Sequence, residues 1–225
     1  MDFLFNYRQP ESPLIEAIWQ TRSDDTGGAF ISSAEYHWEM VITKQHGKTT
    51  CTVRGPETSA KLAPVPEDAD FFGIVFKVGT FMPHLPTKHL VNAGINLPEA
   101  SQQSVWLKSS AWQLPTFDNA DTFINRLVHD GILTHDPIVQ EVLQDQPPDL
   151  SLRTIQRRFL QATGITQGTM IQIQRAQHAA QLLQQGTPIL DTTYQAGYAD
   201  QPHLTRSLKR FMGQTPAQML ELNLA

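Results

Sequence analysis

The sequence Ser151-Leu152-Arg153-Thr154-Ile155-Gln156-Arg157 has a counterpart 49 residues later, Asp200-Gln201-Pro202-His203-Leu204-Thr205-Arg206. The same offset pairs Phe159 with Leu208, Gly164 with Gly213 and Thr166 with Thr215. Each copy consists of a capping residue, an arginine-bearing segment with helical periodicity, a glycine and a threonine. A repeat at one fixed offset indicates two copies of one supersecondary unit. We interpret each copy as a helix-turn-helix, which makes the chain a candidate DNA-binding regulator.

Capping residues and apolar spacing predict the helices of both copies. In the first copy, Asp136 caps a short support helix at residues 137–144, and Ser151 caps a second helix that ends near Gly164. The positions of that second helix predicted to face inward are Leu152, Ile155, Phe159 and Ala162. A long helix over about residues 167–185 leads to the second copy. There we expect a support helix at 189–196, a turn at Gly197, a helix that starts after Asp200 and a last short helix from about 215.

The outward faces of the two capped helices have the side chains that read DNA. A single helix fits the major groove, where arginine donates to guanine and glutamine bonds to adenine. Arg157 and Arg206 occupy the same position in their copies, and Arg158, Lys209 and Arg210 are suited to contact phosphates. The predicted DNA-binding residues are Arg153, Thr154, Gln156, Arg157, Arg158, Gln201, His203, Arg206, Lys209 and Arg210. Two such helices on a stiff connector are expected to enter successive major grooves about 34 Å apart.

Charge is distributed unevenly along the chain. Residues 151–225 hold seven Lys and Arg against three Asp and Glu, for a net charge of +4. Residues 1–150 have a net charge of −9, which gives the whole chain its −5. Such asymmetry is typical of a nucleic-acid module joined to an acidic partner domain.

Three segments of the C-terminal part resemble the AraC/XylS family of bacterial transcription regulators. They are residues 153–166 (Arg-Thr-Ile-Gln-Arg-Arg-Phe-Leu-Gln-Ala-Thr-Gly-Ile-Thr), Arg175 with Ala179 and Leu182-Leu183, and residues 196–216 (Ala-Gly-Tyr-Ala-Asp-Gln-Pro-His-Leu-Thr-Arg-Ser-Leu-Lys-Arg-Phe-Met-Gly-Gln-Thr-Pro). The resemblance covers about residues 136–222 and implies two helix-turn-helix units joined by one long helix. It places the family's base-reading positions on Arg153, Gln156, Arg157, Pro202, His203 and Arg206.

The chain departs from the family pattern in two places. The first turn, at 145–150, is two residues longer than the second and lacks its glycine, and Pro202 has no donor to offer a base. The N-terminal part faintly resembles a sensor-like domain of some members, through Pro13-Leu14, Trp19, Gly55-Pro56 and residues 73–79.

Short apolar runs separated by prolines distinguish the first 115 residues from the rest. Residues 38–43, 49–54 and 71–78 are rich in β-branched and aromatic side chains and predict strands, with a hairpin turn at 45–48. Residues 14–19 are a short helix or strand, and residues 120–133 have the periodicity of a helix. We therefore predict an α+β chain with a mainly-β domain at 1–117 and an all-α DNA-binding domain at 118–225. The mainly-β domain is expected to be a sandwich or a barrel, and a cupin-like fold is one form it could take.

The N-terminal part shows no clear catalytic or metal site. His37, His46, His84 and His89 lack metal-ligand spacing, and Cys51 has no neighbouring base to activate it. We expect no catalytic residue, no metal and no cofactor. The aromatic residues Trp19, Trp38, Phe72, Phe76 and Trp106 belong either to the core or to an effector pocket.

The composition favours a cytoplasmic regulator that binds double-stranded DNA. The chain has one cysteine, no apparent signal peptide and no apolar run long enough for a membrane span. A small-molecule effector, RNA polymerase and a second copy are further candidate partners. Three alternatives remain open: a cupin-like metal-binding or enzymatic domain fused to a DNA-binding tail, a DNA-repair protein that uses Cys51, and an adaptor that has lost DNA binding.

Overall fold

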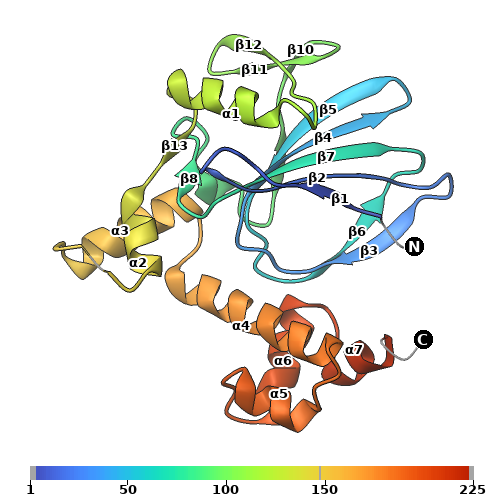
Figure 1. Ribbon diagram of the computed structural model, residues 1–225, viewed down its shortest axis with the longest axis vertical. Coiled ribbons are helices and arrows are strands. Elements are labelled where there is room, and N and C mark those ends of the chain that lie inside the picture. The colour runs from blue at the N-terminus through green and yellow to red at the C-terminus, as the bar shows by residue number, and fades with distance from the viewer. Residues whose placement is uncertain (1–3, 147, 223–225) are drawn as a thin grey trace. The chain divides into compact units, whose positions relative to one another are not determined.

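The computed structural model describes residues 4–146 and 148–222 (Figure 1). Its internal contacts group the chain into two compact units. The sheet unit comprises Met1–Gly28, His37–Pro56 and Pro64–Thr166, and the helical unit comprises Ala29–Tyr36, Glu57–Ala63 and Gln167–Ala225. The two predicted domains, 1–117 and 118–225, remain a prediction, because these units divide the chain at other positions.

A six-stranded antiparallel sheet forms the body of the sheet unit. Its order is β1 (Asn6–Arg8), β2 (Ile15–Arg22), β7 (Asp70–Phe76), β4 (Glu39–Gln45), β5 (Lys48–Arg54) and β9 (Gly94–Asn96). The predicted strands are confirmed, and the ambiguous segment at 14–19 is a strand. The hairpin between β4 and β5 turns at His46 and Gly47, which both have positive φ, as a two-residue turn of the right twist requires.

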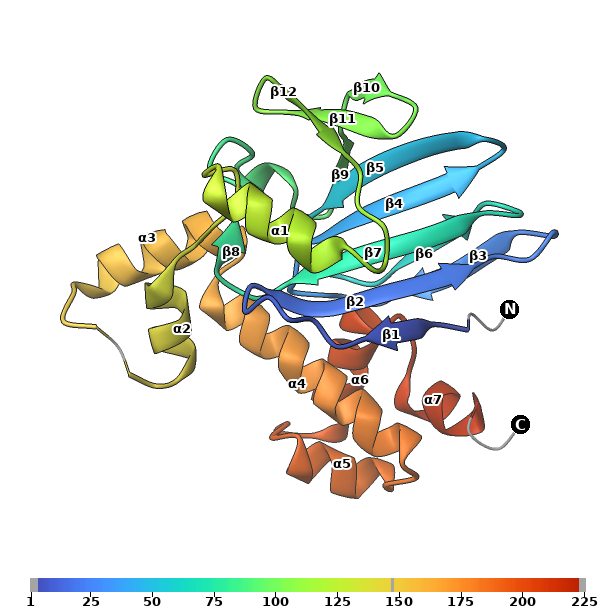
Figure 2. The same ribbon diagram turned by 45° about the horizontal axis from the view of Figure 1, so that its top comes forward.

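One face of this sheet is covered by a second layer (Figures 1 and 2). The layer consists of a three-stranded sheet, β10 (Glu99–Ser101), β11 (Ser104–Leu107) and β12 (Ser110–Gln113), and of helix α1 (Ala120–His129). Ile18, Ile42 and Ile74 of the large sheet pack in one buried cluster with Leu107, Trp112 and Leu127 of the covering layer. The predicted mainly-β fold followed by helices is therefore confirmed, whereas its cupin-like version remains a prediction.

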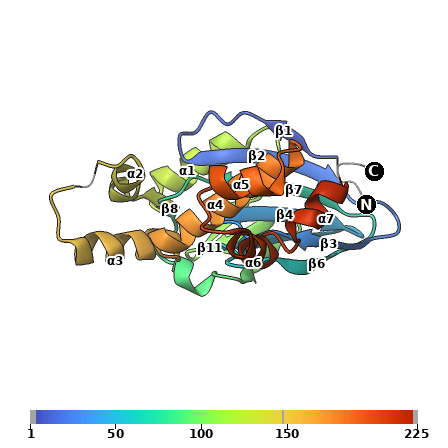
Figure 3. The same ribbon diagram turned by 90° about the horizontal axis from the view of Figure 1, so that it is seen from below.

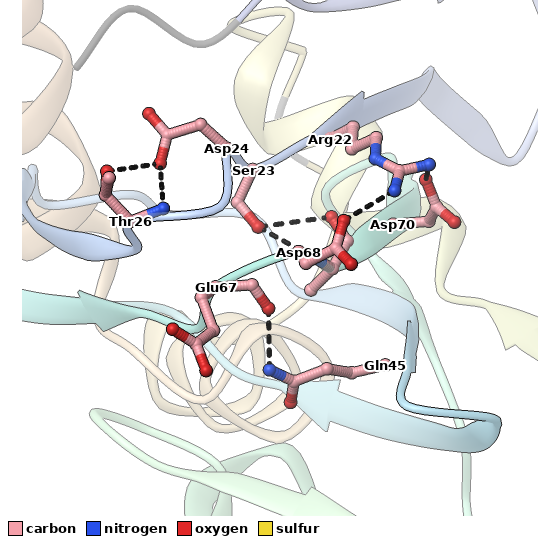
Figure 4. A network of polar contacts seen from close by, with 9 residues as sticks. Arg22, Ser23, Asp24, Thr26, Gln45, Glu67, Asp68 and Asp70 are labelled. Carbon is pink, nitrogen blue, oxygen red and sulfur yellow. Dashed lines mark hydrogen bonds and ion pairs between the residues drawn. The ribbon is translucent and has the colours of Figure 1, made fainter.

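Polar contacts fix the edges of the sheet unit. Asp121, in the first turn of α1, accepts hydrogen bonds from the backbone N–H groups of Glu11 and Ser12, at 2.8 and 2.9 Å, and from Arg8 at 2.6 Å. Figure 4 shows a second network, in which Arg22 at the end of β2 forms ion pairs with Asp68 and Asp70. These contacts join chain segments that are distant in sequence.

The first predicted helix-turn-helix belongs to the sheet unit. Strand β13 (Thr134–His135) pairs with β8 (Thr80–Phe81), and helices α2 (Pro137–Leu143) and α3 (Leu152–Thr163) follow. Helix α3 contacts β8 and the short helix η1 (Thr87–His89), where Thr87 Oγ1 donates to the carbonyl of Gln161 at 2.8 Å. The first helix-turn-helix is thus packed on strands and loops of the N-terminal part.

The second helix-turn-helix forms the helical unit with its connector. Helices α5 (Ile189–Gln195), α6 (Gln201–Phe211) and α7 (Pro216–Leu222) all contact the long helix α4 (Gln167–Gln184) (Figure 3). Residues 29–36 and 57–63, which hold most of the paired strands β3 (Gly28–Ser32) and β6 (Lys61–Val65), also belong to this unit. Ala34 and Ala60 donate their N–H groups to the carbonyls of Phe211 and Arg210, at 2.6 and 2.8 Å. The segments just after β3 and just before β6 therefore form hydrogen bonds with the carboxyl end of α6.

The repeat is visible in the helix bounds. Helices α3 and α6 start at 152 and 201, and α4 and α7 start at 167 and 216, so both pairs keep the offset of the sequence repeat. The first turn, residues 144–151, is three residues longer than the second, residues 196–200, rather than two as predicted. Pro147 of that turn lies outside the described residues. Within the described part of the chain, no helix has both the length and the apolar character needed to cross a bilayer.

Candidate nucleic-acid interface

Side-chain caps start both predicted reading helices. Ser151 Oγ accepts a hydrogen bond from the backbone N–H of Thr154 at 3.3 Å, and Asp200 Oδ1 accepts one from the N–H of His203 at 2.7 Å. Each cap satisfies a backbone donor that has no partner inside the helix. Pro202 falls in the first turn of α6, where no backbone donor is required. Both predicted caps are confirmed.

Helix α3 has one apolar face and one exposed polar face. Ile155, Phe159 and Ala162 are buried, as predicted. The prediction that Leu152 faces inward is wrong, because this side chain is 69% exposed. Leu152 is the first helical residue, and its Cβ leans toward the amino end, beyond the packed part of the helix. The exposed face holds Arg153, Gln156 and Arg157.

Helix α6 repeats this division. Leu204, Ser207, Leu208 and Phe211 are buried, and Gln201, Arg206, Lys209 and Arg210 are exposed. The half-buried His203 ring lies edge-on to the ring of Tyr198, with 5.1 Å between ring centroids. The structure thus brings Arg153, Gln156 and Arg157 onto the exposed face of α3, and Gln201, Arg206, Lys209 and Arg210 onto exposed positions of α6. The predicted residues Thr154, Arg158 and His203 are only partly exposed.

The exposed arginines differ in their intramolecular partners. Within residues 4–146 and 148–222, no ion pair involves Arg153, Arg157 or Arg206. Arg158, in contrast, is bound to Asp136: Nε donates to Oδ2 and Nη2 donates to Oδ1, both at 2.8 Å. The Arg210 guanidinium lies 4.8 Å from the centre of the Phe211 ring.

Sequence reasoning missed the polar contacts that surround helix α6. The Tyr198 hydroxyl is bonded to Ser207 Oγ at 2.8 Å, and the Arg175 guanidinium carbon lies 4.4 Å from the Tyr198 ring centre. Tyr198 is in the turn between α5 and α6, and Ser207 is on the buried face of α6. The repeat aligns Ser207 with Arg158, but it does not indicate the partner of either side chain.

The alternative chemical sites of the N-terminal part receive no support. Burial raises the pKa of the Cys51 thiol to about 12, so at neutral pH this group is not a thiolate nucleophile. Among the described residues, no group of three or more His, Cys, Asp and Glu side chains is placed to hold a metal ion. Trp38 and Phe76 stack at 3.9 Å between ring centroids, and both are buried in the core.

Comparison with known proteins identifies the C-terminal part. Residues 149–221 match the family model of a helix-turn-helix domain. No curated protein matches the chain. Among solved structures, the chain is similar to ToxT from Vibrio cholerae O395, with a TM-score of 0.39 and 11% identity over 98% of this chain and 97% of that chain. The unsaturated fatty acid-bound form of ToxT from strain SCE256 gives a TM-score of 0.35 and 13% identity over 97% and 94% of the two chains.

Proposed function

We propose that this chain is a sequence-specific transcription regulator, and that residues 149–221, which match a helix-turn-helix domain, form a DNA-binding domain of the AraC/XylS type. Helices α3 and α6 each enter a major groove with the exposed polar face described above. Arg153, Gln156 and Arg157 of α3, together with His203 and Arg206 of α6, contact base edges. Thr154, Gln201, Lys209 and Arg210 contact the backbone.

The free guanidinium groups of Arg157 and Arg206 carry this proposal. They occupy equivalent positions of the repeat, both are exposed, and no ion pair involves either of them among the described residues. An arginine in this state keeps its paired donors available for the O6 and N7 acceptors of guanine. The basic Lys209 and Arg210 stand in the last turn of α6, further from the helix start that approaches the bases.

A selection from random DNA tests the assignment. Arg206→Ala is expected to weaken binding to the selected operator by about 1–3 kcal/mol and to relax one base position, because it removes a base contact. Lys209→Ala, one turn further along the same helix, is the matched control. It should weaken binding to operator and random DNA alike and lower the salt dependence by about one phosphate contact. If Arg206→Ala reduces both affinities equally, Arg206 does not read a base.

We further propose that the sheet unit binds a small-molecule effector. A cavity of about 560 Å³ opens beside its large sheet, a volume in the usual range for small-molecule sites. Gln20, Ile42, Lys44, Phe72, Thr116 and Phe117 contribute to its lining. Of the five aromatic residues considered for a pocket, Phe72 lines this cavity. The mixture of apolar walls with amide, hydroxyl and ammonium groups suits a small amphipathic molecule.

A library screen by thermal shift, followed by a cavity-filling variant, tests the effector site. Thr116 is exposed at the cavity, so Thr116→Trp is expected to fill the space without disturbing the buried core. The variant should lose the thermal shift caused by the active compound and keep operator binding in its absence. An unchanged shift would place the compound elsewhere.

The selection from random DNA also reports on the oligomeric state of the bound protein. An operator with inverted half-sites would indicate a symmetric dimer, whereas one asymmetric site would indicate a single copy with two reading helices. Because its proposed ligand is double-stranded DNA, we infer that the chain works in the bacterial cytoplasm, where RNA polymerase is a candidate partner.

A further inference from the structure

Arg158 and Ser207 occupy equivalent positions of the repeat, and both are held by an intramolecular polar contact. We propose that the side chain at this position orients the reading helix in each copy. Its polar contact, which we call the tie, is the Arg158–Asp136 ion pair in the first copy and the Ser207–Tyr198 hydrogen bond in the second. The proposal deepens the proposed function, on which it rests. It changes the role of Arg158 from a phosphate contact to a positioning residue.

In the first copy the tie is a two-point ion pair. The Arg158 guanidinium spans both oxygens of Asp136, each at 2.8 Å, in the planar geometry that arginine and carboxylate share. Asp136 is buried, and its Oδ1 also accepts the backbone N–H of Ile138 at 3.0 Å as the cap of α2. Its own N–H donates to the carbonyl of Gly79 at 2.8 Å. Asp136 therefore joins α3 to the support helix and to the loop before β8.

This ion pair leaves few hydrogen-bond donors of Arg158 available for DNA. The Arg158 side chain is 39% exposed, and two of its nitrogens already donate to a buried carboxylate. Removal of these donors would leave the Asp136 charge without its partner in a largely desolvated place, which is energetically costly. A phosphate that competes for the guanidinium would have to break this pair.

In the second copy the tie is a hydrogen bond with a stacked cation. The Tyr198 hydroxyl and Ser207 Oγ are 2.8 Å apart, and Tyr198 is 4% exposed. Arg175 of α4 covers the Tyr198 ring and donates from Nη1 to the carbonyl of Gly197 at 3.4 Å. The edge-on His203 ring rests against the same tyrosine. Tyr198 thus links α4, the turn and α6, next to two proposed base contacts.

Asp136→Asn separates the two roles of Arg158, because they predict opposite changes in operator affinity. Asparagine keeps Oδ1, which caps α2 and accepts from Arg158 Nη2, but it removes the charge and turns the Oδ2 acceptor of Nε into an amide donor. The two-point ion pair is therefore broken. A positioning role predicts that the ratio of operator to random-DNA affinity falls by about tenfold, the size of one good base contact. A phosphate-contact role predicts an unchanged ratio, with operator and random DNA both bound more tightly, because the released guanidinium would strengthen binding to all DNA. Asp191→Asn is the matched control, because it removes an exposed charge from the support helix of the other copy.

Arg158→Lys provides a second readout that a mere loss of stability would not produce. Lysine keeps the charge but cannot form the two-point pair. As a positioning residue, Arg158→Lys should lower the affinity ratio about as much as Arg158→Ala does, with no change in the salt dependence for either. As a phosphate contact, the lysine should restore binding, and Arg158→Ala should lower the salt slope by about 0.9.

Tyr198→Phe and Ser207→Ala test the second tie. Each removes one end of the same hydrogen bond, while Tyr198→Phe retains the ring under Arg175. We expect each to lower the affinity ratio severalfold, the double variant to lose no more than either single variant, and base preference to relax at the positions read by α6. Additive losses would show that the bond does not act as one tie.

The outcomes separate this proposal from the proposed function. If the wild-type chain selects no DNA sequence, the proposed function itself fails. If it selects an operator, but Asp136→Asn and Tyr198→Phe keep the full affinity ratio, only the positioning proposal is overturned. Melting curves of each variant confirm that it is folded at the assay temperature.

Discussion

Gly164→Ala perturbs the contact between helix α3 and the N-terminal loops. Gly164 ends α3 with φ of 80°, in the left-handed region that glycine favours. A Cβ built there would lie 3.0 Å from the backbone carbonyl of Thr87 and 3.0 Å from Val91 Cγ2. The substitution therefore adds both backbone strain and crowding.

The magnitude follows from a matched glycine in the same unit. Gly131 also has a left-handed φ, 64°, but a Cβ added there would meet no atom of the described residues within 4 Å. Alanine in this conformation costs about 1–2 kcal/mol, partly offset by about 0.4–1 kcal/mol from the stiffer unfolded chain. Crowding against backbone atoms adds about 1–3 kcal/mol at Gly164 alone. We expect Gly164→Ala to destabilise the protein by about 1–3 kcal/mol more than Gly131→Ala.

Urea denaturation followed by tryptophan fluorescence measures this difference. All four tryptophans lie in the sheet unit, which also contains both glycines, so the signal reports the relevant unfolding. Gly164→Ala should show the lower urea midpoint. It should also weaken operator binding, because α3 no longer packs closely on η1. Equal midpoints for the two variants would show that α3 does not pack on Thr87 and Val91.

Two further predictions concern buried groups of the sheet unit. Burial raises the pKa of Asp121, but the Ser12 amide, the Arg8 guanidinium and the Glu11 amide outweigh burial and keep that pKa below its ordinary value. The ionised carboxylate therefore stabilises the fold above about pH 4, and this stabilisation is lost as the pH falls further. Asp121→Asn should lower the free energy of unfolding by about 3 kcal/mol at pH 7 and by progressively less toward pH 3, as measured by urea denaturation. A constant difference over this range would contradict the role of the charge. Cys51, buried and with a pKa of about 12, should react with a thiol reagent at pH 7 only after unfolding, and fast labelling of the folded chain would show that its strand opens.

Local rules explain why the sequence predicted the secondary structure well. The caps Ser151 and Asp200, and the helix-ending Gly164 and Gly213, act on their immediate neighbours, so their roles were evident without coordinates. The same holds for the two-residue hairpin turn and for the alternating strands of the sheet. Leu152 was misjudged because apolar spacing does not show where the packing partner of a helix ends.

Contacts between distant segments could not be predicted in this way. The pairing of residues 29–36 and 57–63 with the helical unit depends on backbone hydrogen bonds, such as that from Ala34 to Phe211, which leave no mark in the sequence. The Arg158–Asp136 ion pair joins residues that are 22 positions apart, and any exposed carboxylate nearby would have looked equally suitable. Helical periodicity indicated the candidate DNA-binding residues, whereas Asp136 and Tyr198, the partners of Arg158 and Ser207, do not occupy equivalent positions of the repeat.

The most direct test of the account compares the base preferences of the wild-type chain, Arg157→Ala and Arg206→Ala in one selection from random DNA. We predict that each variant loses preference at a different base position, and that the two positions are separated by about one helical turn, near 10 base pairs. If both variants relax the same position, or if neither changes the selected sequence, the two copies do not read successive major grooves with these arginines.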